Sequence, residues 1–305
     1  MARRKKGRKL DGWLIIDKPA GISSSAVVNK LKWVLDAQKA GHAGTLDPEA
    51  TGLLAVAFGE ATKTLPLITD DLKAYDFHVR LGQATNTDDA EGEVIAESDL
   101  RPSDAEIVAA LPAFVGDIEQ IPPEFSAVKI DGERAYARAR RGEDVTIAPR
   151  PLYVDHLSLI ARPDPDHATL HLVCGKGGYV RSIARDLGRS LGCLAHVKTL
   201  HRIWSGPFSL EEHGVSFDTF DLPEKTPELD AQLLPIEAAL GDVPEIELSE
   251  PQMRAVKQGN AIVPFATDLP HGTEAWASFN GYVIAHGKFE AGTFFPTRVL
   301  NRALP

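Results

Sequence analysis

The sequence has little cysteine, with only Cys174 and Cys193 in 305 residues. These two residues are far apart and form no C-x-x-C spacing, which excludes a disulfide framework and a cysteine-rich zinc site. The chain also lacks an apolar run long enough to cross a bilayer, so we expect no transmembrane helix. No apolar segment of the secretory type follows the basic N-terminus, MARRKKGRKLDGW, and the expected location is therefore the cytoplasm.

Positive charge is also in deficit, because the formal net charge is −10. Its distribution is uneven. Residues 1–45 hold ten Lys and Arg against three Asp, residues 173–205 hold six against one, and residues 211–250 hold twelve acids and only Lys225. The two basic segments can therefore face a nucleic acid together, although a single charge run is more often only a solvated face.

At 305 residues the chain exceeds the usual size of a single hydrophobic core, so we expect one large domain and a smaller one. Residues 12–17 predict a buried strand, residues 23–35 a helix capped by serine, and residues 53–58 a strand reached through a glycine-rich loop. Residues 74–81 alternate apolar and polar side chains, which is typical of a half-buried strand. Residues 102–114 predict a helix with Ser103 as its N-cap, and residues 135–142 a charged helical piece.

A strand at residues 168–174 and a glycine turn precede a helix that opens at Tyr179. On this helix Arg181, Arg185 and Arg189 are spaced by four and form one basic stripe. Such a stripe beside a glycine turn suits phosphate contacts, and ordinary helix solubility explains it equally well.

The C-terminal part begins with an acidic connector over residues 211–244, in which residues 229–240 predict one helix. Residues 245–305 then predict a compact end piece with a helix at 250–258 and strands at 275–279, 282–286 and 294–300. The connector carries no dimer signature, and we expect a monomer.

Asp47 stands in the sequence Leu46-Asp47-Pro48-Glu49 and has two interpretations. An Asp N-cap followed by Pro is a common helix start, and the local pattern alone favours that structural role. However, the surrounding glycines, with His42 and Thr45 between them, allow backbone and a carboxylate to approach a bound ligand closely.

The sequence resembles the bacterial TruB family of tRNA pseudouridine synthases almost from end to end. The motifs that carry this resemblance are, in order, GWLIIDKP from Gly12, AGHAGTLDP from Ala40, GLL from Gly52, GEATK from Gly59, KAY from Lys73, QIPP from Gln120, SAVK from Ser126, GGYVR from Gly177, and GCLAHVKTL from Gly192. Each motif alone is weak, whereas their order and spacing are specific.

The resemblance implies an α+β protein with the pseudouridine synthase fold, a mixed and largely antiparallel sheet with flanking helices. It implies a catalytic domain over residues 12–240 with an insertion at about 120–150, a basic arm at residues 1–11, and a PUA-like RNA-binding domain at residues 245–305. The expected reaction converts the T-arm loop uridine at position 55 of tRNA to pseudouridine. No cofactor or metal is needed, because redox state and atom count do not change.

The resemblance also assigns site residues. Asp47 matches the catalytic nucleophile, Arg181 the arginine that keeps it ionised, and Tyr75 the tyrosine that stacks on the base and can remove a proton. His42 matches the residue that takes the place of the flipped base. Tyr179 and Leu200 match pocket residues, and Lys18 and Lys63 are supporting positions that we count with the substrate-binding residues. Departures from the family pattern at Asn86, Phe125, Gly178 and His201 affect only fine contacts to RNA.

Other functions fit less well. A non-catalytic RNA-binding or tRNA-folding protein does not need Asp47 together with Arg181, and the insertion resembles the stand-alone bacterial type more than guide-RNA-dependent relatives. A hydrolase using a serine from residues 23–25 with His42 and Asp47 lacks a G-x-S-x-G elbow. Zinc binding by His42, His78 and Asp47 lacks ligand spacing.

Overall fold

The structure is a computed structural model that describes residues 7–130, 132–143, 145–241, 243–265 and 267–303. The first six residues of the expected basic arm lie outside this set. The chain divides into two compact units. The first contains Met1–Pro48, Leu53–Thr69 and Gly206–Pro305, and the second contains Glu49–Gly52 and Asp70–Ser205.

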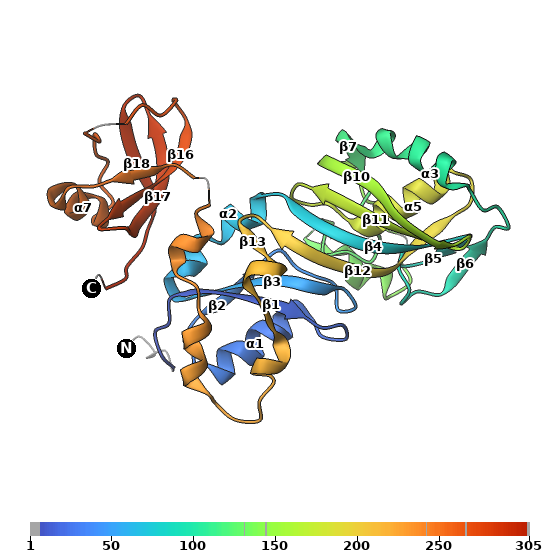
Figure 1. Cartoon of the computed structure of the whole chain (residues 1–305), viewed down its shortest axis with the longest axis horizontal. Helices are drawn as coiled ribbons and strands as arrows, with labels where there is room; N and C mark the ends of the chain where they lie inside the picture. Colours follow the sequence, from blue (N-terminus) through green and yellow to red (C-terminus); the bar gives the residue numbers. More distant parts are fainter. Residues whose placement is uncertain (1–6, 131, 144, 242, 266, 304–305) are drawn as a thin grey trace. The chain divides into compact units, whose positions relative to one another are not determined.

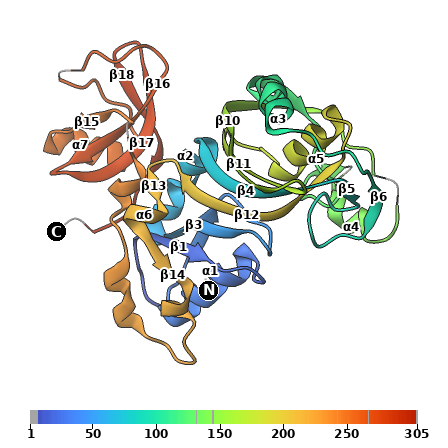
Figure 2. The ribbon, with the colours of Figure 1, turned by 45° about the vertical axis from the view of Figure 1, so that its right-hand side comes forward.

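The first unit contains a small sheet built from the N-terminal motifs. Strand β1 (Gly12–Lys18) pairs in parallel with β14 (Gly214–Ser216) and lies beside β3 (Thr51–Phe58), which pairs antiparallel with β2 (Ala40–Ala43). Helix α1 (Ser24–Val34) begins where the Ser23 side chain accepts a hydrogen bond from the Ala26 N–H, as expected. Its apolar side chains pack with Leu14 and Ile16 of β1 and with Leu54, Val56 and Phe58 of β3. Figure 2 shows the helix beside these strands.

The end of the chain forms a second sheet within this unit (Figure 1, red). Its order is β15 (Glu245–Glu247), β16 (Thr273–Phe279), β17 (Tyr282–Glu290) and β18 (Thr293–Val299), with helix α7 (Glu250–Lys257) against it. The strands and the helix confirm the pattern expected for residues 245–305, and the sheet has its own buried cluster around Ile284 and Phe294. Its PUA-like character stays a prediction.

Two short elements, η1 (Gly59–Lys63) and α2 (Leu65–Asp70), follow β3, and β13 (Phe208–Ser209) and α6 (Leu210–His213) precede β14. The 3-10 turns η3 (Phe217–Phe220), η4 (Pro227–Gln232) and η5 (Ile236–Ala239) lie between β14 and β15. The single helix expected at residues 229–240 is wrong, because this stretch holds two 3-10 turns separated at Leu233–Pro235. Pro235 has no N–H to donate and precludes a continuous helix there.

The second unit is built on a sheet of long strands (Figure 1, cyan to yellow). The first two residues of β3 pair in parallel with β12 (Ala195–Ser205), and then β4 (Lys73–Leu81), β11 (His167–Cys174), β10 (Arg150–Asp164) and β7 (Gly116–Gln120) follow, each antiparallel to its neighbour. Helix α5 (Val180–Ser190) packs on β12 and β4. The sheets and helices of the two units confirm the α+β class with a mixed, largely antiparallel sheet.

Smaller elements of the second unit are β5 (Gln83–Thr85), β6 (Val94–Glu97), α3 (Asp104–Ala110), η2 (Leu111–Phe114), β8 (Lys129–Ile130), β9 (Glu133–Arg134) and α4 (Ala135–Ala139). Helix α3 begins with the expected Ser103 cap, completed by Glu106 as a capping box.

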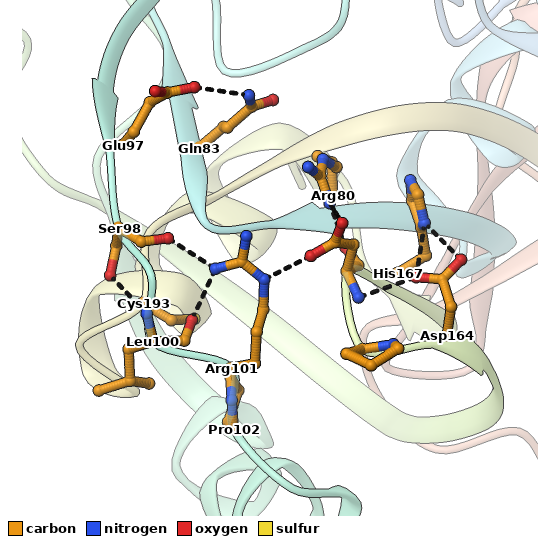
Figure 3. A network of polar contacts seen from close by, with 12 residues as sticks. Arg80, Gln83, Glu97, Ser98, Leu100, Arg101, Pro102, Asp164, His167 and Cys193 are labelled. Atoms are coloured by element: carbon orange, nitrogen blue, oxygen red, sulfur yellow. Dashed lines mark hydrogen bonds and ion pairs between the residues drawn. The ribbon is translucent and has the colours of Figure 1, made fainter.

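A polar network fixes the segment that follows β6 (Figure 3). Arg101 donates to the Ser98 carbonyl oxygen at 2.6 Å and contacts the Asp166 carboxylate at 2.5 Å. The same carboxylate lies 2.6 Å from the Arg80 guanidinium at the end of β4. The β5–β6 arm is therefore tied to the hairpin between β10 and β11.

Candidate active site

Asp47 lies in the loop between β2 and β3, and its side chain is half-buried. No helix begins after it, because Pro48 and Glu49 form a bend and the chain enters β3 at Thr51. The helix-start interpretation of Asp47 is therefore wrong. The chain passes into the second unit at Glu49, two residues after Asp47.

Both peptide neighbours of Asp47 are held by buried polar side chains of the first unit. The Ser24 hydroxyl accepts from the Leu46 N–H and donates to the Leu46 carbonyl, each at 2.9 Å. On the other side, the Lys18 ammonium donates to the Pro48 carbonyl oxygen at 2.8 Å. These contacts fix the backbone that carries the Asp47 carboxylate.

Lys18 is fully buried at the end of β1 and has two further acceptors, the carbonyl oxygens of Pro19 at 2.8 Å and Ile22 at 2.9 Å. A buried ammonium is stable only when its donors are satisfied, and these carbonyls meet that requirement. The structure thus gives Lys18 a role in holding the Asp47 loop, a role that the sequence pattern did not distinguish from substrate binding.

The other two expected residues of the first unit differ in their surroundings. His42 is half-buried on β2, opposite Val56 of β3. The Lys63 ammonium on η1 lies 2.7 Å from the Glu60 carboxylate and 2.6 Å from the Val299 carbonyl oxygen at the end of β18. Lys63 therefore links η1 to the C-terminal sheet.

The remaining expected residues belong to the second unit. Tyr75 is buried on β4 and pairs with Arg202 of β12, whereas Leu200 pairs with Phe77 two residues further along β4. Since alternate residues of a strand share one face, the side chains of Tyr75 and Leu200 lie on the same face of this strand pair. Tyr179 directly precedes α5 as its N-cap residue.

Gly52 explains how β3 approaches this strand pair. Its φ is +95°, and a Cβ atom there would lie 2.3 Å from the Arg202 carbonyl oxygen. Any side chain at position 52 would therefore force β3 away from β12. The Thr51 hydroxyl lies 2.8 Å from His201 Nδ1, which adds a side-chain contact at the same place.

The start of α5 is fixed by segments on both sides. The Gln120 amide oxygen accepts from the Tyr179 N–H at 2.9 Å, and its nitrogen donates to the Tyr179 carbonyl at 3.1 Å. The Tyr179 side chain packs on an apolar cluster of the insertion, formed by Val128, Ala135 and Ile147. The insertion and β7 together hold the N-terminus of the helix.

Arg181 is almost completely buried, with 6% of its surface exposed. Its guanidinium donates to the carbonyl oxygens of Thr87 at 3.0 Å and Phe125 at 3.1 Å, and it lies 3.2 Å from the Asp89 carboxylate. Charged hydrogen bonds of this kind fix both the position and the plane of the guanidinium.

Two arginines of the basic stripe, Arg181 and Arg185, are buried, so the expected phosphate contacts are wrong for them. Arg185 is also buried, and its guanidinium lies 2.8 Å from the Asp88 carboxylate and 2.8 Å from that of Asp186. Only Arg189 is well exposed on the helix surface. Helical spacing places the three side chains on one face, but it does not reveal the acidic turn that covers the first two.

Asp89 is a candidate site residue that sequence reasoning missed. It lies in the polar turn after β5, and more than ninety positions separate it from Arg181. No local pattern joins the two residues. The only available signal is the pair of consecutive acids, Asp88 and Asp89, matched to two arginines one helical turn apart.

The part of the chain that the structure describes has neither a metal-binding cluster nor a membrane-spanning helix. Within residues 7–130 and the later described ranges, no group of three or more His, Cys, Asp or Glu side chains is arranged to hold a metal ion. In the same ranges, no helix is long and apolar enough to span a membrane.

Comparison with solved structures identifies known proteins of the same fold. The chain superposes with a TM-score of 0.73 on "Crystal Structure of a Cbf5-Nop10-Gar1 Complex", at 24% identity over 96% of this chain and 84% of that one. It superposes equally well, at 20% identity, on "Structure of H/ACA RNP bound to a substrate RNA containing 2'-deoxyuridine", over 99% of this chain and 92% of that one. At this identity the likeness defines the fold.

Sequence comparison gives the family. Residues 32–180 match the model "TruB family pseudouridylate synthase (N terminal domain)", and residues 181–241 match "tRNA pseudouridylate synthase B C-terminal domain". Proteins named tRNA pseudouridine synthase B from Dinoroseobacter shibae and Roseobacter denitrificans are 63% and 61% identical over 301 residues, which cover 99% of this chain and of each relative. The chain belongs to the TruB family of pseudouridylate synthases.

Proposed function

We propose that the protein isomerises uridine 55, in the T-arm loop of tRNA, to pseudouridine, with Asp47 as the nucleophile. The observation that carries the proposal is the Asp47 loop itself. Its carboxylate stands between two backbone positions that Ser24 and Lys18 hold, in a segment that the family model covers. A carboxylate held in this way can act as a nucleophile without help from a cofactor.

The reaction balances without any added group. The C1'–N1 bond of the uridine breaks, the uracil rotates while it stays bound, and a C1'–C5 bond forms. The hydrogen on C5 leaves to water, and N1 gains a proton. Asp47 attacks C1' or the base, or it stabilises positive charge at C1'. In a glycal route, a base removes the C2' proton to form the C1'=C2' double bond, and the proton returns to C2' when C5 bonds to C1'.

Arg181 would keep the Asp47 carboxylate ionised by supplying a positive charge to the site. Its three fixed contacts support this role, because a guanidinium that is already oriented needs no further ordering when the substrate binds.

The target base has to leave the T-loop before its glycosidic bond is accessible. In the proposal, Tyr75 stacks on the flipped base and takes the proton released from C5, and His42 occupies the vacated place. Tyr179 and Leu200 line the pocket. Lys18 positions the Asp47 loop, whereas the contacts of Lys63 support a role in holding the C-terminal sheet.

The remaining parts of the proposal concern the partner. The sheet of residues 245–305 would add affinity for tRNA, and the protein would act as a monomer in the cytoplasm, where its substrate is found. Deletion of residues 245–305 is expected to weaken RNA binding more than the chemical step. A truncated protein that binds RNA tightly but is inactive would contradict that assignment.

The test uses an unmodified T-arm stem-loop labelled with tritium at uridine C5, incubated with the protein and a chelator. The proposal expects tritium release to water, and primer extension after carbodiimide treatment should map pseudouridine to the loop uridine alone. A matched stem-loop with cytidine at that position is the control. Tight binding without release would instead favour a non-catalytic RNA-binding or tRNA-folding protein.

A further inference from the structure

The first two turns of α5 hold two ion pairs of the same kind, side by side. Arg181 contacts Asp89, and Arg185, one helical turn later, contacts Asp88. The two carboxylates are consecutive in the turn that joins β5 to β6. The proposed function assigns a role to the Arg181 pair alone, and it leaves the Arg185 pair without one.

The backbone of Asp88 explains how both acids reach the same helix. In an extended segment, consecutive side chains point in opposite directions. Asp88 has a φ of +60°, in the left-handed region that non-glycine residues rarely adopt. This reversal turns the carboxylates of Asp88 and Asp89 toward the same face of α5.

The turn is closed by its own polar groups. The Thr85 hydroxyl donates to the Asp89 carbonyl oxygen at 2.6 Å, and the Thr87 hydroxyl donates to Asp89 Oδ1 at 2.5 Å. The Asp88 carbonyl oxygen accepts from the Val197 N–H of β12 at 3.0 Å. With Oδ1 engaged by Thr87, Asp89 presents Oδ2 to Arg181.

Arg185 connects this turn to a second segment. Its guanidinium lies 2.8 Å from Asp88 Oδ2 and donates to the Ile121 carbonyl oxygen at 2.8 Å. Arg181 repeats this arrangement one turn earlier with Asp89 and the Phe125 carbonyl. Each arginine therefore joins the acidic turn to the start of the insertion.

The Asp88 carboxylate is costly to bury, although its partner gains from the contact. Burial raises the pKa of Asp88 while the Arg185 charge acts in the opposite direction, and, despite its burial, the pKa of Arg185 is raised by the carboxylates of Asp186 and Asp88. A buried carboxylate with a raised pKa destabilises the folded protein at neutral pH relative to acidic pH. The left-handed backbone adds a further cost. Such costs are typical of groups retained for function.

We propose that Asp88 and Arg185 are positioning residues for the isomerisation, which hold the turn on α5 so that Asp89 keeps Arg181 in place. This inference rests on the proposed role of Arg181 in the reaction. Arg185 acts through Asp88 and the Ile121 carbonyl, and neither member of the pair needs to touch the RNA.

The test measures single-turnover tritium release, with enzyme in excess over the C5-labelled stem-loop. Asp88→Asn keeps the shape of the side chain and a residue type that tolerates the left-handed backbone, but it removes the charge. The rate should fall between about 10-fold and about 100-fold, the range expected when a catalytic group is displaced by about 1 Å. Affinity for the RNA, measured by filter binding, should not change.

A double-mutant cycle separates positioning from general stability. In an Asp89→Asn background, Asp88→Asn should lower the rate by less than about twofold, because Asp88 would act through Asp89. If Asp88→Asn lowers the rate by the same factor in both backgrounds, or leaves it unchanged in the wild type, the inference is wrong. Arg185→Lys keeps the charge that faces Asp88, and it should retain more activity than Arg185→Gln.

Asp36→Asn is the matched control. Asp36 also has a left-handed backbone, with a φ of 51°, and a short ion pair, to Lys225, but it belongs to the first unit. Its substitution should leave the rate unchanged. Asp47→Asn is measured in parallel. If Asp47→Asn is still active, the proposed function fails, whereas an inactive Asp47→Asn with a fully active Asp88→Asn overturns only the positioning role.

Discussion

Lys18 offers a sharp test of how the Asp47 loop is held. Its ammonium is fully buried and donates to three carbonyl oxygens, those of Pro19, Ile22 and Pro48, at 2.8–2.9 Å. Lys18→Met keeps an unbranched side chain as far as Cε and removes the ammonium with its three donors. Each buried acceptor that loses its partner costs about 1–3 kcal/mol, which gives a gross loss of about 3–9 kcal/mol.

Part of this loss is offset, because the variant no longer has to bury a charge, which costs several kcal/mol. We therefore expect the free energy of unfolding to fall by about 2–4 kcal/mol. The Pro48 carbonyl also loses the contact that fixes the residue after Asp47. The single-turnover rate should consequently fall by up to about 100-fold, even at temperatures where the variant is folded.

Urea unfolding followed by circular dichroism measures the first quantity, and tritium release under single-turnover conditions measures the second. Lys30→Met is a suitable control, since Lys30 forms a surface ion pair with Asp221 on the same unit and should contribute less than about 1 kcal/mol. The reasoning is refuted if Lys18→Met is as stable as Lys30→Met, or if it turns over at the wild-type rate.

Three further predictions follow from charge. Burial, with the nearby Arg202 charge, lowers the pKa of Lys73 to about 8, so the unfolded chain binds a proton that the folded protein lacks between pH 8 and about 10.4. Wild-type stability should therefore rise over that range, and denaturation of Lys73→Met should show no such rise. Hydrogen bonds from Arg101 and Arg80 lower the pKa of Asp166 to about 2. The stability that these hydrogen bonds supply is complete above pH ~4 and is lost as the pH falls through 2. If the free energy of unfolding of Asp166→Asn falls as much over this pH range as that of the wild type, the network of Figure 3 is contradicted. RNA affinity should fall as the salt concentration rises, and Arg189→Gln should reduce the slope of log K against log salt by up to about 1. Arg185→Gln should leave this slope unchanged, because the Arg185 side chain is buried. If the two variants have the same slope, the buried arrangement of Arg185 is contradicted.

Local sequence signals predicted the elements that depend on neighbours in the chain. Ser23 and Ser103 marked the starts of α1 and α3, and the alternation around Phe77 marked β4, because caps and strand periodicity are encoded within a few residues. Strands β10 and β12 have no clear signal in the sequence. Register shifts at Val154/His156 and at Val197/Thr199 interrupt their alternation, so the period of two is lost in the sequence.

The candidate site divides in the same way. Asp47 and its glycine-rich surroundings are one continuous segment, and the sequence identified them. Apart from Asp186, which follows Arg185 directly, the partners of the two arginines come from segments more than fifty positions away, and only the fold brings them to α5. The spacing of the arginines therefore predicted correctly that they share one face of α5, but it did not predict that Arg181 and Arg185 are buried on that face.

The most direct test of the central claim is tritium release from the C5-labelled T-arm stem-loop by wild-type protein, Asp47→Asn and the neighbouring control Glu49→Gln. Asp47→Asn changes only the charge and nucleophilicity of one side chain. The account predicts full release by the wild type and by Glu49→Gln, and no release by Asp47→Asn although it still binds the RNA. Turnover by Asp47→Asn at a rate close to that of Glu49→Gln would contradict the role of Asp47 as the nucleophile.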